Sequence, residues 1–488
     1  MTIQAMDTTR LAHDNKLFIG GRWVAPSSSE MVSIISPSTE EVVYQLPAVT
    51  QADAEDAVAA ARAAFGPWSA LSFADRRTVV TRFCSELKKR IDLIRDVWAV
   101  EAGMPVTVGE TFNAGMAMIL DDMVEISGTI TMSEIRQTVA GPVQVRREPI
   151  GPTLAIVTYN GPHTEIALAV IPALMAGNTF VIKLPPESQM LGYVFADAAD
   201  AAGFPPGVLS IFSADAEVSR YLVAHEEIDA VHFTGGTEIG AEIVQACAKR
   251  IARVTLELGG KSAAIVAEDA DLDAALPHLI GAMTTYCGQI CVAMTRIVVP
   301  RSRHDEIVDR LVAGLSTIRI GDPLSRETQY GPLAASRVRA RAEGYIERAV
   351  AAGARIAFGG QRPDQLDRGW YLEPTLLVDV ENGMEVAQNE IFGPVICVIP
   401  YDSIEDAIAI ANDSRYGLSG SVFTTNPATA EFVSDKVRSG TFAINAAFPS
   451  MLAPFGGMKQ SGLGSEGGRE AFFELTNLKS IALPPQAD

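Results

Sequence analysis

Basic charge, cysteine and long apolar runs are all scarce in this sequence of 488 residues. No uninterrupted apolar run reaches the length that spans a bilayer, and the start, Met1 to Lys16, has no apolar centre, so we expect neither a membrane segment nor a signal peptide. The 39 basic residues are outnumbered by 59 acidic ones, and the net charge of -20 argues against nucleic acid or an anionic membrane as partner. We therefore expect a soluble, cytoplasmic protein.

The number and spacing of the cysteines and histidines argue against a disulfide framework and a metal site. The five cysteines are an odd and small set, which is atypical of a disulfide framework and favours a reducing compartment. Cys287 and Cys291 stand four residues apart, but no histidine or second cysteine pair lies near them in the sequence, and the six histidines lack metal-ligand spacing. The sequence thus predicts no metal site, although the two neighbouring thiols permit reversible oxidation.

The middle of the chain alternates short apolar runs with helical stretches, which is typical of a doubly wound parallel sheet. Strands are expected at Leu154–Thr158, Thr179–Lys183, Leu209–Phe212, Ala230–Thr234 and Arg253–Glu257, and helices at His163–Ala176, Ser188–Ala202, Ala216–Ala224 and Thr237–Lys249. A second α/β series follows Cys291, with strands expected at Arg296–Val299, Thr375–Val378, Val395–Ile399, Ser421–Thr424 and Thr441–Asn445. Before them, Asp53–Phe65 and Arg76–Val100 are expected to be helices.

Two stretches carry side chains suited to covalent catalysis. Glu257 lies at the end of an expected strand, before Leu258-Gly259-Gly260-Lys261, and Cys291 ends the string Gly288-Gln289-Ile290-Cys291. A thiol with little bulk over its sulfur can attack a carbonyl, and a carboxylate at a strand end can take a proton from water. Taken alone, however, a lone cysteine is more often a small buried hydrophobic residue.

The strings FTGGTEIG, LELGGK, GQIC, EIFGPV and PFGGMKQSG occur in the order found in the aldehyde dehydrogenase superfamily, which the chain resembles from about Phe18 to Leu483. The resemblance implies an α/β fold with two doubly wound parallel-sheet domains and a small β element for oligomerisation. Residues 1–133 and 150–257 would form the dinucleotide-binding domain and residues 258–445 the catalytic domain. Residues 134–149 and 476–488 would be oligomerisation strands, and residues 446–475 would return to the active site.

By the same resemblance, three residues carry the reaction. Cys291 matches the catalytic nucleophile and Glu257 the general base that activates water. Asn160 matches the asparagine whose side-chain amide holds the oxyanion together with the Cys291 backbone N–H. Without the resemblance, an asparagine in Tyr159-Asn160-Gly161-Pro162 would be interpreted as a turn former.

The resemblance also implies a nicotinamide dinucleotide as cofactor, with NAD preferred and NADP possible. Gly235 and Gly236, between strand and helix, would let backbone amides approach a phosphate, although the family usually has serine where Gly236 stands. The full set of residues expected to contact the cofactor is Thr158, Tyr159, Lys183, Glu187, Gly235, Gly236, Gly240, Leu258, Gly259, Glu390 and Phe392. The string Gly462-Leu463-Gly464-Ser465-Glu466-Gly467 formally satisfies a dinucleotide fingerprint, but no expected strand precedes it directly. Glu466 matches a proton-relay glutamate, whose usual lysine partner corresponds to Ala169.

The substrate tunnel departs most from the family pattern. Gly161, Leu168 and Thr285 stand where bulky aromatic residues are common, Glu165 stands at a usually apolar position, and Tyr286 replaces a frequent asparagine. These residues predict a wider and more polar tunnel for a bulky or hydroxylated aldehyde.

The sequence therefore predicts an oligomeric, dimeric or tetrameric enzyme that oxidises an aldehyde to its carboxylic acid with NAD(P). An acyl-coenzyme A-forming dehydrogenase is one alternative, which Glu257 disfavours because such family members typically lack that glutamate. A cofactor-independent thiol esterase and a binding protein that retains the fold without catalysis are the others.

Overall fold

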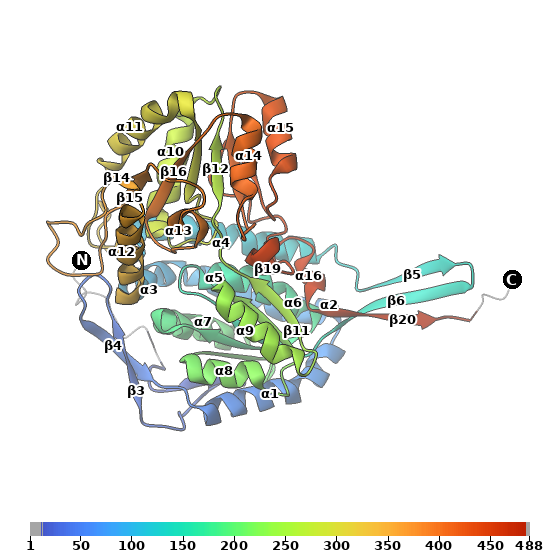
Figure 1. Ribbon diagram of the computed structural model, residues 1–488. Coiled ribbons are helices and arrows are strands. Elements are labelled where there is room, and N and C mark those ends of the chain that lie inside the picture. The colour runs from blue at the N-terminus through green and yellow to red at the C-terminus, as the bar shows by residue number, and fades with distance from the viewer. Residues whose placement is uncertain (1–10, 12, 485–488) are drawn as a thin grey trace.

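Two mostly parallel sheets organise the chain, as the computed structural model shows for residue 11 and residues 13–484 (Figure 1). The first sheet has the order β19-β11-β10-β7-β8-β9-β1-β2. Its parallel centre consists of β7 (Pro152–Ile156), β8 (Thr179–Leu184), β9 (Leu209–Ser213), β10 (Ala230–Thr234) and β11 (Arg253–Glu257). Antiparallel strands complete its edges, namely β1 (Leu17–Ile19), β2 (Arg22–Val24) and β19 (Gly462–Leu463). The five central strands lie within a residue or two of those predicted.

The order of these strands creates a crevice between β7 and β10. After β7 the chain adds β8 and β9 on one side, and then crosses to the other side to add β10 and β11. Helices that leave neighbouring strands toward opposite faces diverge at such a switch point, and ligands bind there beyond the carboxyl ends of the strands.

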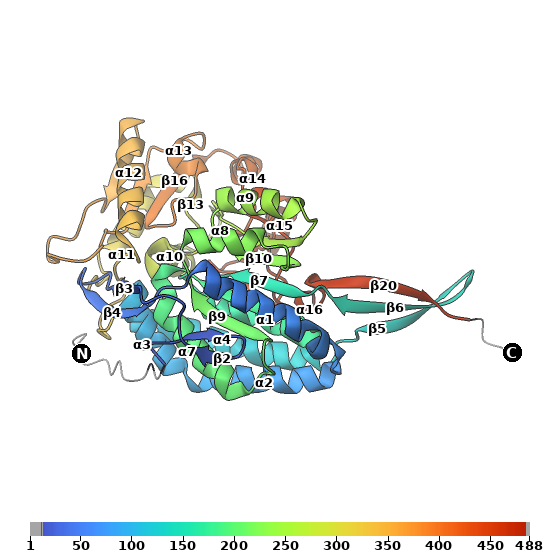
Figure 2. The same ribbon diagram turned by 90° about the horizontal axis from the view of Figure 1, so that it is seen from below.

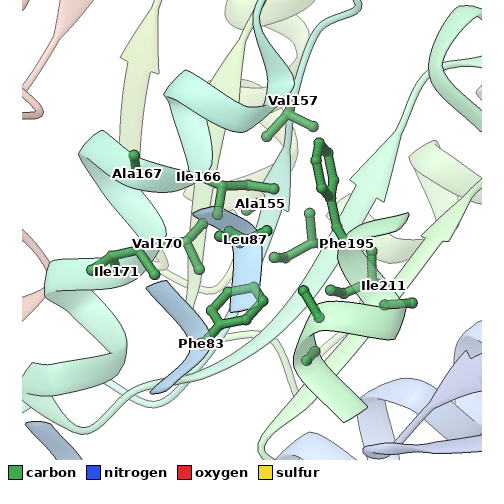
Figure 3. Packing of buried hydrophobic residues seen from close by; sticks show 14 of the residues in the cluster. Phe83, Leu87, Ala155, Val157, Ile166, Ala167, Val170, Ile171, Phe195 and Ile211 are labelled. Atoms are coloured by element: carbon green, nitrogen blue, oxygen red, sulfur yellow. The ribbon is translucent and has the colours of Figure 1, made fainter. Parts of the chain in front are cut away.

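Helices cover both faces of the first sheet, because side chains along each buried strand alternate between them. On one face Leu154 and Ile156 pack against α1 (Gln51–Ala70), α8 (Ala216–Ala224) and α9 (Thr237–Ala248). On the other face Ala155 packs against α2 (Phe73–Lys89), α3 (Ile91–Ala102), α4 (Val106–Ser127) and α7 (Gln189–Ala202). Figure 3 shows this second core, where Phe83 and Leu87 of α2 meet side chains from α7 and from the segment after β7.

The second sheet has the order β14-β15-β16-β13-β12-β17-β18, and only β14 is antiparallel within it. Its strands are β12 (Ala263–Val266), β13 (Arg296–Pro300), β14 (Arg355–Phe358), β15 (Thr375–Val378), β16 (Val395–Tyr401), β17 (Gly420–Phe423) and β18 (Ala443–Ile444). Its helices are α10 (Leu272–Thr284), α11 (His304–Leu315), α12 (Ser336–Ala351), α13 (Glu385–Gln388), α14 (Ile404–Asn412) and α15 (Pro427–Lys436). Two parallel sheets with helices confirm the predicted fold class.

A third, small sheet extends away from both of the others (Figures 1 and 2). It has the order β20-β6-β5 and consists of β5 (Ser133–Thr138), β6 (Gly141–Pro149) and β20 (Thr476–Ala482). These strands fall in the two segments predicted to mediate oligomerisation, of which residues 485–488 lie outside the described residues. The remaining elements are the hairpin of β3 (Met31–Ile35) and β4 (Val42–Pro47) and the short helix α16 (Ala471–Glu474). None of the helices in the described part of the chain combines the length and apolar character that crossing a membrane requires.

Two predicted helices need correction. The stretch Arg76–Val100 is two helices rather than one, because Arg90 leaves the helical conformation (φ -100°, ψ 11°) and its N–H bonds back to Leu87. The stretch His163–Ala176 is also interrupted, since a π turn (Ile166–Val170) separates α5 (Pro162–Glu165) from α6 (Ile171–Ala176).

Proline explains the π turn. Pro172 has no N–H to donate to the carbonyl of Leu168, so an α-helical bond is lost there. The Leu168 carbonyl instead accepts the backbone N–H of Gly467 at 3.2 Å. The helix is thereby joined to the segment that returns to the first sheet at β19.

Candidate active site

A cavity of about 1330 Å³ brings together residues that lie far apart in the sequence. Its wall includes the segments that follow β7, β8, β10 and β11, the loop that carries Cys291, and parts of α4 and α12. Of the residues predicted for the site, the cavity wall contains Cys291, Glu257, Asn160, Thr158, Tyr159, Lys183, Glu187, Gly235, Gly236, Leu258, Gly259, Glu390, Phe392, Gly161, Glu165, Leu168 and Thr285.

A tight turn presents Cys291 to this cavity. Tyr286, Cys287 and Gly288 all have positive φ, and a Cβ at position 288 would lie 2.6 Å from the carbonyl oxygen of Gly393, so only glycine fits there. Gln289 then fixes the loop, since its Oε1 accepts the Tyr159 hydroxyl at 3.0 Å. Cys291 is half-buried, whereas the other four cysteines are buried.

The thiol of Cys291 is held in its protonated form. Burial raises its pKa, and the carboxyl groups of Glu390 and Glu257 raise it further. Since the thiolate is the nucleophilic form, Cys291 requires a neighbouring base or a positively charged ligand to ionise it.

Glu257 is the carboxyl group best placed to act as that base or to activate water. It ends β11 and is 2% exposed, and neither of its carboxyl oxygens has a hydrogen-bond partner among the described residues. Burial raises its pKa well above the ordinary value, and the nearby charges of Glu466, Glu474 and Glu165 add to the shift. A buried carboxyl without partners, in a cavity wall, is ready to accept a proton from a bound molecule.

Asn160 lies in the loop after β7 and is held by the side chain of its neighbour. Its Oδ1 lies within hydrogen-bond distance of the Thr158 hydroxyl. The same hydroxyl contacts Glu165 Oε1, and the Thr158 N–H donates to Glu165 Oε2 at 2.9 Å. The three residues form one polar cluster beneath the cavity surface.

The N-terminus of α9 forms a cradle suited to a phosphate. Gly236 caps this helix without a side-chain hydrogen bond, and a Cβ there would meet nothing within 4 Å. The first N–H groups of a helix have no partner inside it, and they bind anions when they are exposed to a cavity. The residues around the crevice therefore fit a dinucleotide.

Two acidic groups and a lysine surround the rest of that region. Lys183, at the end of β8, is buried, which lowers its pKa to about 8. Glu187 forms an ion pair with Arg337 of α12. Glu390 accepts the N–H of Gly260 at 3.2 Å, and burial raises its pKa to about 7. A Cβ at Gly259 would lie 2.1 Å from Glu390 Oε2, so this contact requires the glycine.

The opposite wall is mainly apolar, and the sequence analysis missed most of it. One face of α4 contributes Val108, Phe112, Met116 and Ile119, whose spacing of three or four residues is the signal that could have identified it. A loop before β19 adds Phe448, Met451, Leu452 and Phe455. The expectation of a more polar tunnel is therefore wrong for this wall. Glu165, the residue on which it rested, turns its carboxyl toward Thr158.

Two predicted site residues lie elsewhere. Tyr286 is fully buried and its hydroxyl donates to the Ala102 carbonyl at 3.0 Å, because the positive φ of its turn directs the ring into the core. Gly240 does not line the cavity either, and it instead lets α9 pack closely on Leu258, whose Cδ2 would lie 2.8 Å from a Cβ. Cys287 is also turned away, since its thiol donates to the Gly331 carbonyl at 3.1 Å. No metal-binding cluster of His, Cys, Asp and Glu is present in the described part of the chain.

Comparison with known proteins agrees with this geometry. The model of the aldehyde dehydrogenase family matches residues 23–481. Geranial dehydrogenase of Castellaniella defragrans is 38% identical over 471 residues, which cover 96% of this chain and 98% of that protein. A Mycobacterium tuberculosis aldehyde dehydrogenase solved with NAD+ superposes with a TM-score of 0.94 at 41% identity, covering 97% of this chain and 99% of that one. Aldehyde dehydrogenase C of Pseudomonas syringae, solved as a mutant with NAD+ and octanal, has a TM-score of 0.93 at 34% identity and covers 98% of each chain. The chain belongs to the aldehyde dehydrogenase family.

Proposed function

We propose that this enzyme oxidises a long, apolar aldehyde to the carboxylic acid, with NAD as the oxidant and Cys291 as the nucleophile. The observation that carries the proposal is the pairing, in one cavity wall, of the half-buried thiol of Cys291 with the unpartnered carboxyl of Glu257. A nucleophile and a free base around one cavity suit acyl formation followed by hydrolysis.

The protein's own groups account for each bond that changes. The Cys291 thiol gives its proton to the Glu257 carboxylate, which passes it to solvent, and the resulting thiolate adds to the carbonyl carbon. The Asn160 side-chain amide with the Cys291 backbone N–H stabilises the oxyanion, a contribution of about 3 kcal/mol. When bound, NAD supplies a nicotinamide ring that accepts the hydride lost from the thiohemiacetal carbon. Glu257 then takes a proton from water, the hydroxide adds to the thioester, and the acid leaves as the thiolate is regenerated.

The cofactor would be held at the crevice between β7 and β10. The N–H groups at the start of α9 would bind its phosphates, with Gly235 and Gly236 allowing the close approach. Lys183 and Glu187 would bind the adenosine ribose, and Glu390 and Phe392 the nicotinamide end. A carboxylate beside the ribose disfavours a 2′-phosphate, which supports NAD over NADP. The two solved relatives described above hold NAD+.

The apolar wall supports the substrate class. Side chains of α4 and of the loop before β19 offer hydrocarbon contacts over most of the tunnel, while Ile290 and Met451 pack beside Cys291. Burying each CH₂ group of a substrate there contributes about 0.8 kcal/mol to binding. The names of two relatives, geranial dehydrogenase and a structure with octanal, fit a long, weakly polar aldehyde.

Domain roles, assembly and location complete the proposal. We propose that residues 1–133 and 150–257 form the dinucleotide-binding domain, residues 258–445 the catalytic domain, and residues 446–475 a segment returning to the site. We propose a cytoplasmic homodimer or homotetramer. The small sheet β20-β6-β5 supports the assembly, because no described strand pairs with the outer edge of β20 and its Leu478 is 62% exposed.

The experiment that tests this function measures NADH and NADPH formation by purified protein with aliphatic, terpenoid, aromatic and hydroxylated aldehydes. Cys291→Ala and Glu257→Gln are measured beside the parent, with Cys84→Ala as a matched control outside the cavity. NADH formation by the parent and the control alone, greatest with long apolar aldehydes, is expected. Activity that requires coenzyme A would establish the acyl-transferring alternative, and ester hydrolysis without any oxidation of aldehydes would establish the esterase.

A further inference from the structure

The hydroxyl of Thr158 lies between two oxygen atoms, and this contact limits where the protons can be. On one side is Oδ1 of Asn160 and on the other Oε1 of Glu165. A threonine hydroxyl has one proton to donate, and both neighbours are acceptors if Glu165 is ionised. The Thr158 oxygen would then lie against one of these two oxygen atoms without a proton between them.

A proton on Glu165 satisfies the whole cluster. The carboxylic acid donates to Thr158 Oγ1, the Thr158 hydroxyl donates to Asn160 Oδ1, and Glu165 Oε2 accepts the Thr158 N–H at 2.9 Å. Each of these three hydrogen bonds then has one donor and one acceptor. Because Asn160 Oδ1 is occupied, its Nδ2 group is left to point away from Thr158.

We propose that Glu165 is a positioning residue that stays protonated and, through Thr158, fixes the side-chain amide of Asn160 with its N–H groups available to the oxyanion. This inference rests on the function proposed above for Asn160. If Glu165 were ionised, the Thr158 hydroxyl would donate to Glu165 and could only accept from Asn160. The amide would then turn its Nδ2 toward Thr158 and its oxygen toward the substrate, where an oxyanion would be repelled.

The surroundings of Glu165 hold the proton in place. The carboxyl is 8% exposed, and burial raises its pKa to about 8, with the charge of Glu466 adding to the shift and the hydrogen bonds from Thr158 opposing it. Glu257 and Cys291 also lie near Glu165, and since each of them is either neutral or negative, neither favours ionisation of Glu165. From α4, which packs against α5, the wall receives Thr107, Val108, Thr111 and Phe112, none of them titratable. The cations of the wall, Lys183, Arg337 and Arg341, are not among the main causes of the shift in the pKa of Glu165.

The rate at which Cys291 attacks the aldehyde should therefore depend on the protonation of Glu165. Ionisation of the Cys291 thiol raises the rate with pH in the parent and in Glu165→Gln alike. The ratio of the parent's rate of acyl-enzyme formation to that of Glu165→Gln should therefore fall as the pH rises through the range in which Glu165 loses its proton. The Glu165→Gln side chain reproduces the protonated acid, since its Nε2 donates to Thr158 Oγ1 and its oxygen accepts the Thr158 N–H. The Glu165→Leu side chain keeps the volume and removes both contacts.

The test follows the single-turnover burst of NADH from about pH 6 to pH 10 in the parent, Glu165→Gln, Glu165→Leu and Thr158→Val. Near neutral pH we expect the burst rate of Glu165→Gln to lie within about threefold of that of the parent. At higher pH the rate of Glu165→Gln should increasingly exceed that of the parent. Glu165→Leu and Thr158→Val should lower the burst rate at saturating aldehyde and NAD by about tenfold to a hundredfold, because an oxyanion donor typically contributes a factor of that order or more. A Glu165→Gln enzyme as slow as Glu165→Leu overturns the proposal, as does a ratio of parent rate to Glu165→Gln rate that does not fall as the pH rises.

A second readout does not depend on activity. In infrared difference spectra, the parent at neutral pH should show a carboxylic acid band that is absent from Glu165→Gln and that disappears at high pH. Failure to find this band overturns the inference even if the enzyme oxidises aldehydes. A parent that shows the band but forms no NADH with any aldehyde would instead refute the proposed function. Thermal melting of each variant confirms that it is folded, and Thr158→Val carries the test should Glu165→Leu not fold.

Discussion

His232 of β10 places its Nε2 atom 3.2 Å from Oε2 of Glu466, and both side chains are 3% exposed. The family's usual partner for this glutamate is a lysine at the position of Ala169, so here a histidine on the neighbouring strand provides the charge or dipole facing the carboxyl. Glu466 also acts on the catalytic centre, because its charge is the largest electrostatic contribution to the raised pKa of Glu257.

The Glu466→Gln enzyme should hydrolyse its acyl intermediate at lower pH than the parent does. Removing a negative charge near Glu257 lowers the pKa of that carboxyl, so its proton-accepting form is present at a lower pH, and the rising limb of the pH profile for acyl-enzyme hydrolysis should move to lower pH. Single-turnover thioester hydrolysis against pH measures this shift. Glu470→Gln, an exposed neighbour, is the control that should leave the limb in place, and an upward shift in Glu466→Gln would contradict the assignment.

Alkylation should be confined to one cysteine. Cys291 is half-buried in the cavity wall while Cys84, Cys247, Cys287 and Cys397 are buried, so iodoacetamide should modify Cys291 and abolish dehydrogenase activity. Because its pKa is raised, the rate of alkylation should still be increasing with pH above about pH 8. Mass spectrometry of intact protein follows the reaction. Cys291→Ala should lose both the modification and the activity, whereas Cys84→Ala should keep both, and rapid labelling of a different cysteine would contradict the geometry.

A larger side chain at Gly115 of α4 should narrow the tunnel. Gly115 lines the cavity and a Cβ there meets nothing within 4 Å, so the leucine in Gly115→Leu has room to extend into the tunnel. We expect kcat/KM for long aldehydes to fall by about tenfold to a hundredfold, with two- or three-carbon aldehydes little affected, since each excluded methylene contact is worth about 0.8 kcal/mol. Gly281→Leu on α10 is the matched control, because that glycine also lies in a helix with open space around it but is outside the cavity. An equal loss with short and long aldehydes would show that Gly115 does not line the substrate path.

Glu101, a buried glutamate, should make the stability of the folded protein depend on pH. Glu101 of α3 accepts the N–H groups of Met190 and Leu191, at 2.8 and 2.9 Å, where α7 begins, and burial raises the pKa of Glu101 to about 8. An unfolded glutamate titrates near pH 4.3, so between about pH 4.3 and pH 8 the folded protein binds the extra proton, and its stability must fall as the pH rises through that window. Glu101→Gln should remove this part of the slope in Tm against pH. The exposed Glu125→Gln should retain it, and an unchanged slope in Glu101→Gln would show that Glu101 is not the titrating group.

That Cys291, Glu257 and Asn160 line one cavity could be predicted from local strings, whereas the shape of the tunnel could not. Cys291, Glu257 and Asn160 each follow a strand or end a glycine-containing turn, so their patterns show in a few consecutive residues. The walls depend on packing between distant segments, so the helical spacing of apolar residues in α4 indicates a buried face but not that this face lines the cavity. Tyr286 was misplaced because its direction depends on a positive φ that no residue type signals. The break at Arg90 went unseen because the apolar spacing of Val80, Phe83, Leu87 and Ile91 continues across it.

The π turn after Glu165 changes the rotation of α5 about the helix axis relative to α6. Each residue of an α-helix turns the chain by about 100°, so the extra residue of a π turn sets α5 and α6 at different angles about their shared axis. Ile166 and Val170 remain in the core beside Phe83 and Leu87 (Figure 3). Deleting one residue from Ile166–Val170 would rotate α5 relative to α6 and carry Glu165 away from Thr158, while α6 could keep its packing. A change of one residue in length, rather than of side-chain chemistry, is thus a route by which related enzymes could disconnect this carboxyl from the oxyanion site.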